Sequence, residues 1–434
     1  MAPAVAQRIS KRPPRPFRRG GPRNIVCTFW LEGRCTRHPC KFLHALPSES
    51  APAAALASKQ EQFQGRKSSR TWKRNPEEAK SGGAKINSSV EPERHDIKRV
   101  EDKKEVCQAW LSGNCMLGDQ DCQYLHTWFY GSGFSLLAKL NGHSDTITGI
   151  ALSSGSDKLY SGSRDKTVRI WDCHTGLCVD ALEMSSEVLC LKCEDPWLFV
   201  GLKNAVKAWN TQKSSEALSF PTAPVPVGEV RAIEAMENML FAGTQGGTIF
   251  AWKFRCEDEI PELPSSLKGH SHAVISLIIG AGMLYSGSMD NTIRVWDMNN
   301  LLCVQTLEGH TGAVLSVLCW DHYLFSCSLD GTVKAWGMAK EDYFELEMLY
   351  SREEQEDGVL KLRGIQDADG KPILLCSCND NSVRLYDLPL FSEGGVLFSK
   401  REVRAIETSS AAGLFFTGDA TGQVTVWKLA GSEN

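Results

Sequence analysis

The sequence repeats itself over its C-terminal two thirds, and this repeat restricts the fold more than any other feature. From Phe134 onward, short runs of β-branched and aromatic residues recur, each bounded by Gly, Asp, Asn or Ser. The repeats end on an aromatic residue at intervals of 38, 43, 44, 40, 50 and 41 residues. These end positions are Trp171, Trp209, Trp252, Trp296, Trp336, Tyr386 and Trp427. A period of about 40–45 residues that closes on Trp-Asp is typical of a four-stranded propeller blade, so the sequence predicts seven blades.

Three of the repeats are nearly alike. They read LYSGSRDKTVRIWD (159–172), LYSGSMDNTIRVWD (284–297) and LFSCSLDGTVKAWG (324–337). Each predicts a strand, a tight polar turn and a second strand, and each repeat opens with a Gly-His pair. Residues 134–430 therefore resemble a seven-bladed WD-repeat β-propeller, an all-β fold.

The resemblance implies a buried hydrogen-bonded set of His, Ser, Asp and Trp in each of these three blades. Buried polar groups need partners, and a satisfied network fixes one geometry. The sets are His143, Ser161, Asp165 and Trp171; His270, Ser286, Asp290 and Trp296; and His310, Ser326, Asp330 and Trp336. Such groups superficially suggest a hydrolase, but they recur at the blade period, as structure does and active sites do not. The sequence also lacks a phosphate loop, a nucleophile elbow and an open metal site, so we predict no enzyme and no small-molecule substrate.

The other four repeats depart from this pattern. Lys203 and Gly246 stand where the Asp would be. Tyr386 replaces the Trp of the sixth repeat, and Thr421 occupies the Asp position of the last. We expect these blades to be held mainly by apolar packing. The last repeat has room for three strands only, so residues 135–140 are expected to supply its outer strand and close the ring.

Two cysteine and histidine clusters precede the repeats. Cys27, Cys35, Cys40 and His44 have the spacing C-x7-C-x4-C-x3-H, and Cys107, Cys115, Cys122 and His126 have the spacing C-x7-C-x6-C-x3-H. Three thiolates and one imidazole form a closed ligand set for structural Zn²⁺. A segment of about 18 residues cannot bury a core, so the metal must supply its folding free energy. The sequence predicts two structural Zn²⁺ ions in segments that resemble CCCH zinc fingers, at 25–46 and 105–128.

The resemblance to CCCH fingers implies binding of single-stranded RNA, and in some cases of DNA. Bases can stack on exposed aromatic rings while Lys and Arg neutralise phosphate. The candidate residues are Phe29, Arg34, Arg37, Lys41 and Phe42 in the first finger and Trp110 and Tyr124 in the second. The second finger has no Lys or Arg between Cys107 and His126, so we expect the first finger to bind better. Packing of Trp110 over the metal is the alternative interpretation of that residue.

The net charge of −4 hides a division of the chain. Residues 1–130 contain 23 Lys and Arg and 13 Asp and Glu, which gives +10, and residues 131–434 contain 25 and 39, which gives −14. Residues 1–24 are expected to form a disordered basic tail and residues 47–104 a disordered linker. We also expect the second finger to dock on the propeller through Trp128, Phe129 and Tyr130. The acidic propeller should repel phosphate, so we assign it to protein partners.

The order of finger, basic linker, finger and propeller resembles a family of plant zinc-finger proteins with WD repeats. The resemblance implies a zinc-dependent adaptor in the nucleus, with the cytoplasm as a second compartment, that binds RNA in preference to DNA. The alternative is a DNA-binding or chromatin-associated regulator whose propeller docks basic protein tails. A ubiquitin-ligase receptor is weaker, because His174 and Asn299 stand where that role needs Arg or Lys. No run of about 18 apolar residues and no secretory signal occurs, so the 16 Cys are expected to be metal ligands or core thiols, and no membrane partner is expected.

Overall fold

The computed structural model describes residues 105–119, 121–154, 157–212, 218–220, 228–253, 264–320, 322–340, 343–353, 358–367, 369–409 and 413–429. The predicted basic tail, first finger and linker lie outside the described residues. Within the described part of the chain, one α-helix is long enough to label, α3 (Gln108–Leu111), and strands dominate. None of the described helices has the length and apolar character that a membrane span requires.

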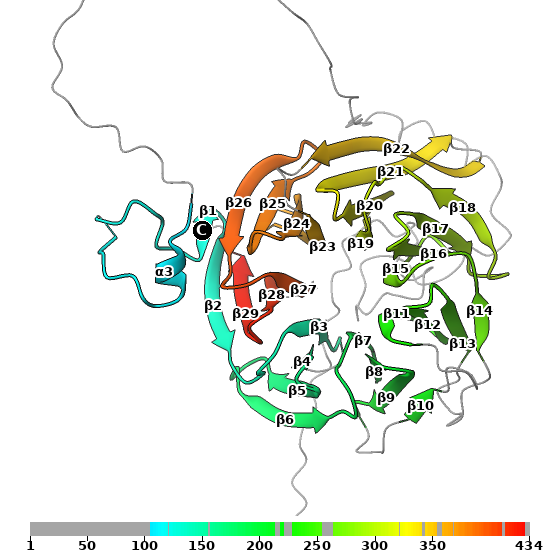
Figure 1. Ribbon diagram of the computed structural model, residues 1–434, viewed down its shortest axis with the longest axis horizontal. Coiled ribbons are helices and arrows are strands. Elements are labelled where there is room, and N and C mark those ends of the chain that lie inside the picture. Colours follow the sequence, from blue (N-terminus) through cyan, green and yellow to red (C-terminus); the bar gives the residue numbers. More distant parts are fainter. Residues whose placement is uncertain are drawn as a thin grey trace, which may run out of the picture. The chain divides into compact units, whose positions relative to one another are not determined.

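The described strands form seven antiparallel sheets arranged around a central axis, which confirms the predicted seven-bladed propeller (Figure 1). The innermost strands of blades one to seven are β3 (Ile147–Leu152), β7 (Cys190–Glu194), β11 (Val230–Met236), β15 (Val274–Gly280), β19 (Val314–Trp320), β23 (Val359–Gln366) and β27 (Val403–Ser409). The second strands are β4 (Lys158–Ser163), β8 (Trp197–Leu202), β12 (Met239–Thr244), β16 (Met283–Ser288), β20 (Tyr323–Ser328), β24 (Pro372–Cys378) and β28 (Leu414–Asp419).

The outer half of each blade completes its sheet. The third strands are β5 (Thr167–Asp172), β9 (Ala205–Asn210), β13 (Ile249–Lys253), β17 (Ile293–Asp297), β21 (Thr332–Lys340), β25 (Ser382–Asp387) and β29 (Val424–Leu429). The outer strands are β6 (Cys178–Glu183), β10 (Leu218–Phe220), β14 (Ser265–Leu267), β18 (Cys303–Leu307), β22 (Tyr343–Glu353), β26 (Ser392–Phe398) and, in blade seven, β2 (Phe134–Leu140).

The turn between the second and third strands has the same backbone conformation in every blade. One residue of each turn is left-handed, with φ between 61° and 86°. These residues are Lys166, Asn204, Gly247, Asn291, Gly331, Asn381 and Gly422. Gly and Asn tolerate this conformation best, which explains why they occupy six of the seven positions. The Asp-Asn and Asp-Gly pairs of the repeats are therefore the chemistry that this tight turn requires.

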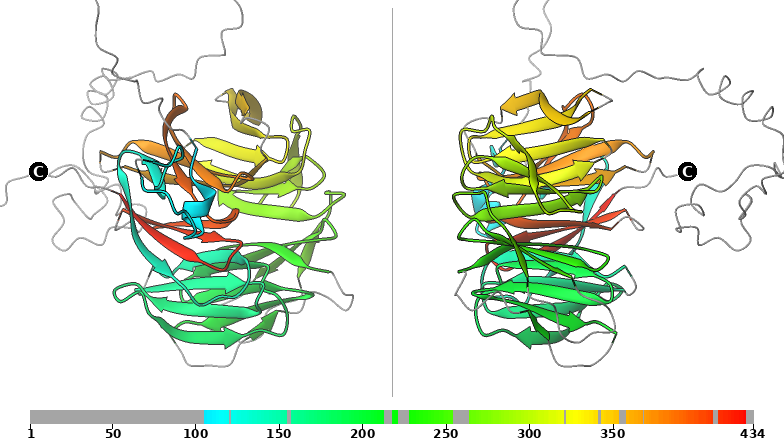
Figure 2. Two further views of the ribbon diagram at one scale, coloured as in Figure 1. Left: turned by 60° about the vertical axis from the view of Figure 1, so that its left-hand side comes forward. Right: turned by 90° about the vertical axis from the view of Figure 1, so that its right-hand side faces the viewer.

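The ring is closed by a strand from the N-terminal side of the propeller. β2 pairs antiparallel with β29, from Phe134 opposite Leu429 to Leu140 opposite Val424. In Figures 1 and 2, β2 in cyan runs along the outer side of β29 in red. The predicted closure by 135–140 is thus confirmed. Pairing the two ends of the propeller covers an edge of blade seven that would otherwise be open.

The core lies between neighbouring blades. One buried cluster joins blades three and four and includes Phe241, Val274 and Trp296. Blades approach so closely here that some positions accept only glycine: a Cβ on Gly287 would lie 2.8 Å from a methyl group of Val314 in the next blade. The Ser-Gly-Ser segment of the repeat is therefore a packing requirement between blades as well as a strand.

Candidate metal centre and nucleic-acid interface

The structure brings the four candidate ligands of the second finger together. The ligand atoms of Cys107, Cys115, Cys122 and His126 all lie within 4.8 Å of one another. In a tetrahedral zinc site, sulfur ligands at about 2.3 Å from the metal are about 3.8 Å apart, so a Zn²⁺ ion fits this spacing. Among the described residues, no other group of His, Cys, Asp or Glu side chains reaches this arrangement. The first-finger ligands Cys27, Cys35, Cys40 and His44 lie outside the described residues.

The local backbone explains how so short a segment places its ligands. Cys107 caps the short helix α3, and its sulfur accepts a hydrogen bond from the Trp110 amide at 3.4 Å. The two ends of the finger are joined because the Cys107 amide donates to the Leu125 carbonyl at 2.9 Å and the Leu125 amide donates to Glu105 at 2.8 Å. These hydrogen bonds hold the first and last ligands of the finger close together without a hydrophobic core.

His126 has the features of a metal ligand whose orientation is set by a second residue. Its Nδ1 donates to the Asp119 carboxylate at 2.7 Å. Its Nε2 is buried and has no hydrogen-bond partner among the described residues. A buried, unpaired nitrogen is costly unless a metal occupies it, and a carboxylate on the other ring nitrogen is the usual partner of a zinc-binding histidine. The residues present therefore fit Zn²⁺ with Nε2 as the ligand atom.

Cys107 differs from two thiols of the propeller. Burial alone would raise the pKa of Cys107, but the hydrogen bond from the Trp110 amide and the neighbouring polar groups of the ligand cluster lower it to about 7. The thiolate is the form that binds metal, so this shift suits a ligand. In blade two, by contrast, burial raises the pKa of Cys190 and of Cys193 to about 12. Those two thiols stay protonated, as core residues do.

Trp110 is half-buried in the second finger. Its ring stacks on His126, with centroids 5.6 Å apart and planes at 8°, and it contacts Trp128 at 5.3 Å. The Lys139 ammonium lies 3.0 Å from the ring centroid of Trp128 and covers that side of the stack. Trp110 thus packs over a metal ligand. Tyr124 is 39% exposed, so it is the finger-two candidate whose ring solvent can reach. The first-finger candidates Phe29, Arg34, Arg37, Lys41 and Phe42 lie outside the described residues.

The second finger is joined to blade six. β1 (Phe129–Gly131) adds a fifth strand to that blade by pairing antiparallel with β26. Phe129 packs edge-on against Phe134 at 5.8 Å, and Phe134 packs in turn against Phe415 at 5.4 Å. Trp128 and Phe129 therefore make the docking contact expected from the sequence. The side chain of Tyr130 does not contribute in the same way, because it is 46% exposed.

The polar networks of blades one, four and five are complete. In blade four, Trp296 Nε1 donates to Ser286 Oγ at 2.9 Å, Ser286 donates to His270 Nε2 at 2.7 Å, and His270 Nδ1 donates to Asp290 at 2.8 Å. The same links join Trp171, Ser161, His143 and Asp165, and Trp336, Ser326, His310 and Asp330, at 2.8–3.0 Å. Burial lowers the pKa of each histidine more than its aspartate raises it, which keeps the ring neutral as this chain of donors requires.

Each network has a further member that the sequence analysis missed. A threonine hydroxyl donates to the same aspartate at 2.6–2.7 Å in all three blades. These residues are Thr167, Thr292 and Thr332. The signal was present, because each threonine follows its aspartate by two residues in the nearly identical repeats. Burial opposes ionisation of these aspartates, but hydrogen bonds from the threonine and from backbone amides, together with the histidine, lower the pKa of Asp290 and of Asp330 to about 2.

The remaining blades follow the expected apolar packing only in part. Blade two buries Met184 and Val200 in its core cluster, and blade three buries Ala242 and Trp252. In blade six, Asp380 instead accepts hydrogen bonds from Ser382 and Arg384.

Blade seven departs from the expectation of apolar packing. Trp427 donates to Thr417 at 2.9 Å, and Ser399 donates to Asp419 at 2.9 Å. Asp419 also accepts a hydrogen bond from the Thr421 hydroxyl. Blade seven therefore has its aspartate two residues before the position that Asp occupies in blades one, four and five. Blade seven therefore keeps a polar network that the sequence analysis did not foresee.

These observations define the class of protein as a WD-repeat propeller that carries a CCCH zinc finger. The family model for the WD domain, G-beta repeat, matches residues 134–172, 261–297 and 301–337. The chain is 46% identical to zinc finger CCCH domain-containing protein 17 of Oryza sativa subsp. japonica, over 93% of this chain and 91% of the relative. It is also 46% identical to zinc finger CCCH domain-containing protein 48 of Arabidopsis thaliana over the same shares, and 45% identical to protein 63 of that species over 95% and 93%. The chain belongs to this family of CCCH zinc finger proteins.

Family and architecture together indicate the general function. Zinc fingers of this type and WD propellers suggest nucleic-acid binding, zinc binding and the scaffolding of protein partners. Protein families built from these two modules are in general not enzymes.

Proposed function

We propose that this protein is a nuclear adaptor that binds single-stranded RNA through zinc-dependent fingers and presents it to proteins held on the propeller. Zinc has a structural role in both fingers, and the protein is not an enzyme. The observation that carries the proposal is a CCCH ligand set with an exposed aromatic ring, Tyr124, between its last two ligands. Exposed rings of this kind stack on unpaired bases, and duplex DNA presents no unpaired bases.

The two fingers divide the work unequally. In the second finger, Trp110 is occupied by its stack with His126 and Trp128, and the side chain of Asp119 is held by His126. No Lys or Arg lies between Cys107 and His126 to neutralise phosphate. The first finger contains Arg34, Arg37 and Lys41 beside Phe29 and Phe42 and follows a basic tail. The first finger therefore provides most of the affinity, and the second finger fixes the RNA close to the propeller.

The decisive measurement compares three polymers on the full-length protein at one salt concentration. Single-stranded RNA should bind more tightly than single-stranded DNA of the same sequence, and both more tightly than duplex DNA. Phe42→Ala should weaken RNA binding by about 1–3 kcal/mol, the usual value for one stacked base, and Tyr124→Ala should weaken it less. Zinc content per chain is measured in parallel. Unchanged RNA affinity in a Phe42→Ala, Arg34→Ala variant that retains its zinc would refute the proposal.

A cellular experiment tests the division of labour and the compartment together. The protein is crosslinked to RNA in cells and the bound fragments are sequenced, with Cys40→Ser and Cys122→Ser measured separately. We expect Cys40→Ser to remove most crosslinks and Cys122→Ser to remove fewer. Neutralising Lys11, Arg12, Arg15, Arg18 and Arg19 should shift the protein out of the nucleus, because a basic run of this kind is typical of an import signal. An unchanged distribution would assign the tail to RNA alone.

A further inference from the structure

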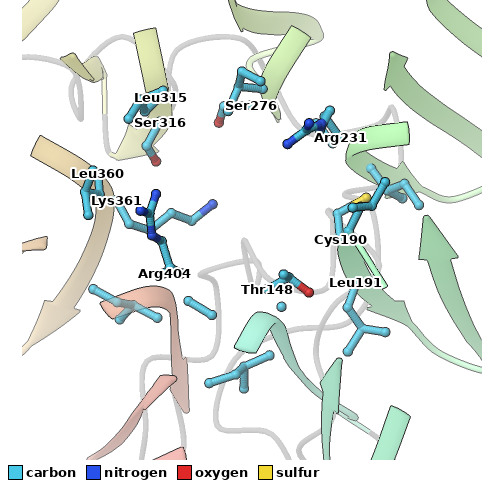
Figure 3. Close-up of a pocket in the computed structure, with 18 of the residues that line it drawn as sticks. Thr148, Cys190, Leu191, Arg231, Ser276, Leu315, Ser316, Leu360, Lys361 and Arg404 are labelled. Carbon is cyan, nitrogen blue, oxygen red and sulfur yellow. The ribbon is translucent and has the colours of Figure 1, made fainter. Parts of the chain in front are cut away.

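A cavity of about 470 Å³ lies on the axis of the propeller and is lined by all seven innermost strands. Figure 3 shows side chains from these strands projecting toward the middle of the ring. A cavity of this size suits a small organic ligand or a single long side chain. Most of the charged residues that line the cavity are cations. In this the cavity differs from the propeller as a whole, since residues 131–434 carry a net charge of −14.

At one level of the channel the charges cancel. Lys192 on β7 forms an ion pair with Glu234 on the neighbouring innermost strand β11. Arg363 on β23 likewise forms an ion pair with Glu407 on β27. These four residues line the cavity as two neutral pairs. They leave no net charge for a ligand at that level.

At the neighbouring level the charges do not cancel. The innermost strands β11 and β27 each contain a bulge after their first residue, and the bulged residues are Arg231 and Arg404. Bulges redirect side chains, and here both guanidinium groups reach the cavity, together with the ammonium of Lys361 (Figure 3). Glu229 and Glu402 pair with the two arginines at the rim.

Lys361 has a cationic side chain without a close partner. It lines the cavity and makes no hydrogen bond or ion pair with another described residue, although it is half-buried in the wall of the channel. Burial lowers the pKa of Lys361, and the positive charge of Arg363 lowers it further. The hydroxyl of Ser316 also points into the cavity and makes no hydrogen bond to another described residue (Figure 3). A half-buried cation and a buried hydroxyl, both aimed into one cavity, together suit an anionic acceptor.

We infer that this channel binds a phosphate ester, held by Lys361 at the centre and by Arg231 and Arg404 at the mouth. Apart from the two neutral pairs, the charged residues that line the cavity are Arg164, Arg231, Lys361, Arg404 and Glu402, and Glu229 pairs with Arg231, which gives a net charge of +2. A phosphate monoester carries about −1.5 to −2 at pH 7, so it matches this charge, and its three oxygens can accept from all three cations. A low-dielectric channel strengthens these contacts relative to the same groups in water.

The same geometry argues against one alternative for the propeller. A basic protein tail that entered the channel would place its own Lys or Arg against Lys361, Arg231 and Arg404. Like charges in an enclosed site repel, so basic tails are excluded from the channel. Basic partners would have to bind the acidic outer surfaces of the propeller instead.

The test uses the full-length protein, calorimetry at fixed ionic strength, and three probes. The probes are pyrophosphate, a short phosphoserine peptide, and the same peptide without phosphate. We expect Lys361→Met to weaken binding of the phosphorylated probes at least about tenfold, and Lys361→Arg to keep most of it. Lys158→Met, at the exposed first position of the second strand of blade one, is the matched control and should bind like the original protein. Pyrophosphate should raise the melting temperature of the original protein and not that of Lys361→Met.

The outcomes separate the two sources of the phosphate. Binding of pyrophosphate alone assigns the channel to a free small phosphate, and preferential binding of the phosphopeptide assigns it to a phosphorylated partner. Removing this unpaired charge should not impair folding, and an unchanged melting temperature of Lys361→Met without any probe verifies this. Equal affinity in Lys361→Met, detectable and equal binding of the two peptides, or no binding of any probe below about 1 mM would overturn the inference. The Phe42→Ala variant should bind the probes normally, so failure of RNA binding and failure of channel binding are distinguishable.

Discussion

Two buried histidines in different parts of this protein have the same partner on one ring nitrogen and opposite environments at the other. In the second finger, His126 Nδ1 donates to Asp119 at 2.7 Å, and in blade four His270 Nδ1 donates to Asp290 at 2.8 Å. His270 Nε2 then accepts a hydrogen bond from Ser286. His126 Nε2 has no partner among the described residues and lies with three cysteines.

The difference shows what each region relies on for its stability. The blade closes its hydrogen-bond network with its own serine and tryptophan, and it packs against neighbouring blades on both sides. Among its described residues, the finger buries only Cys107, Leu111 and Cys122, so a metal is needed to complete its network. The same histidine and aspartate pair therefore serves a self-sufficient fold in one place and a metal-dependent fold in the other.

Removing a metal ligand should have the largest effect and should be confined to the finger. Cys122→Ser is expected to lose one Zn²⁺ per chain, because the metal supplies about 10–16 kcal/mol of apparent folding free energy in such modules. Residues 105–126 should then become sensitive to protease, while the melting temperature of the propeller changes little. Metal analysis and limited proteolysis measure both effects. Loss of the propeller transition together with the finger would show that the two regions are not independent.

Removing the corresponding histidine from a blade should have a smaller effect. His270→Ala leaves Ser286 and Asp290 buried without their partner, which should lower the free energy of unfolding by about 2–4 kcal/mol. His174→Ala is the matched control, because that side chain is 75% exposed and should change stability by less than about 0.5 kcal/mol. Chemical denaturation measures both variants. Equal effects of the two substitutions would mean that the network does not stabilise the blade.

The sequence predicted the parts of both regions that recur or that follow a fixed spacing. The seven aromatic positions predicted seven blades because each pairs with the same position of the second strand, as Trp171 does with Leu159 and Trp296 with Leu284. The spacing of the cysteines predicted the ligand cluster because a short chain that must surround one ion has few arrangements. Closure by β2 followed from the missing fourth strand of the last repeat.

The sequence could not predict contacts that occur only once. Asp119 precedes His126 by seven residues across a loop, and nothing in that interval distinguishes it from Asp121. The cations of the channel come from different blades at positions where other blades have Thr148 or Leu315, so the repeat conceals them. Their meeting on one axis is a consequence of ring geometry. The network of blade seven escaped notice for a related reason, since Asp419 stands two residues before the expected position.

Removing the carboxylate that orients His126 should weaken zinc binding without abolishing it. Asp119→Ala is expected to lower the zinc affinity of the second finger about 10–100-fold, because the imidazole loses the hydrogen bond that fixes its tautomer and direction. Asp121→Ala removes the same charge two residues away and is the matched control. Competition with a chelator measures the affinity of the full-length protein, with Cys40→Ser as background so that only the second site reports. Equal affinities in the two aspartate variants would mean that the carboxylate does not orient the ligand.

Mild acid should lower the free energy of unfolding of the propeller, and this is the smallest of the expected effects. Burial lowers the pKa of His270 below its ordinary value of 6.5. The unfolded chain therefore binds more protons than the native blade just below pH 6.5, so the free energy of unfolding falls as the pH decreases through that range. Each such histidine contributes at most about 1.4 kcal/mol per pH unit. His270→Gln removes one titrating group, and the slope of stability against pH between 6.5 and 5 should decrease by up to one proton. An unchanged slope in His270→Gln would mean that the native network already contains a protonated imidazole.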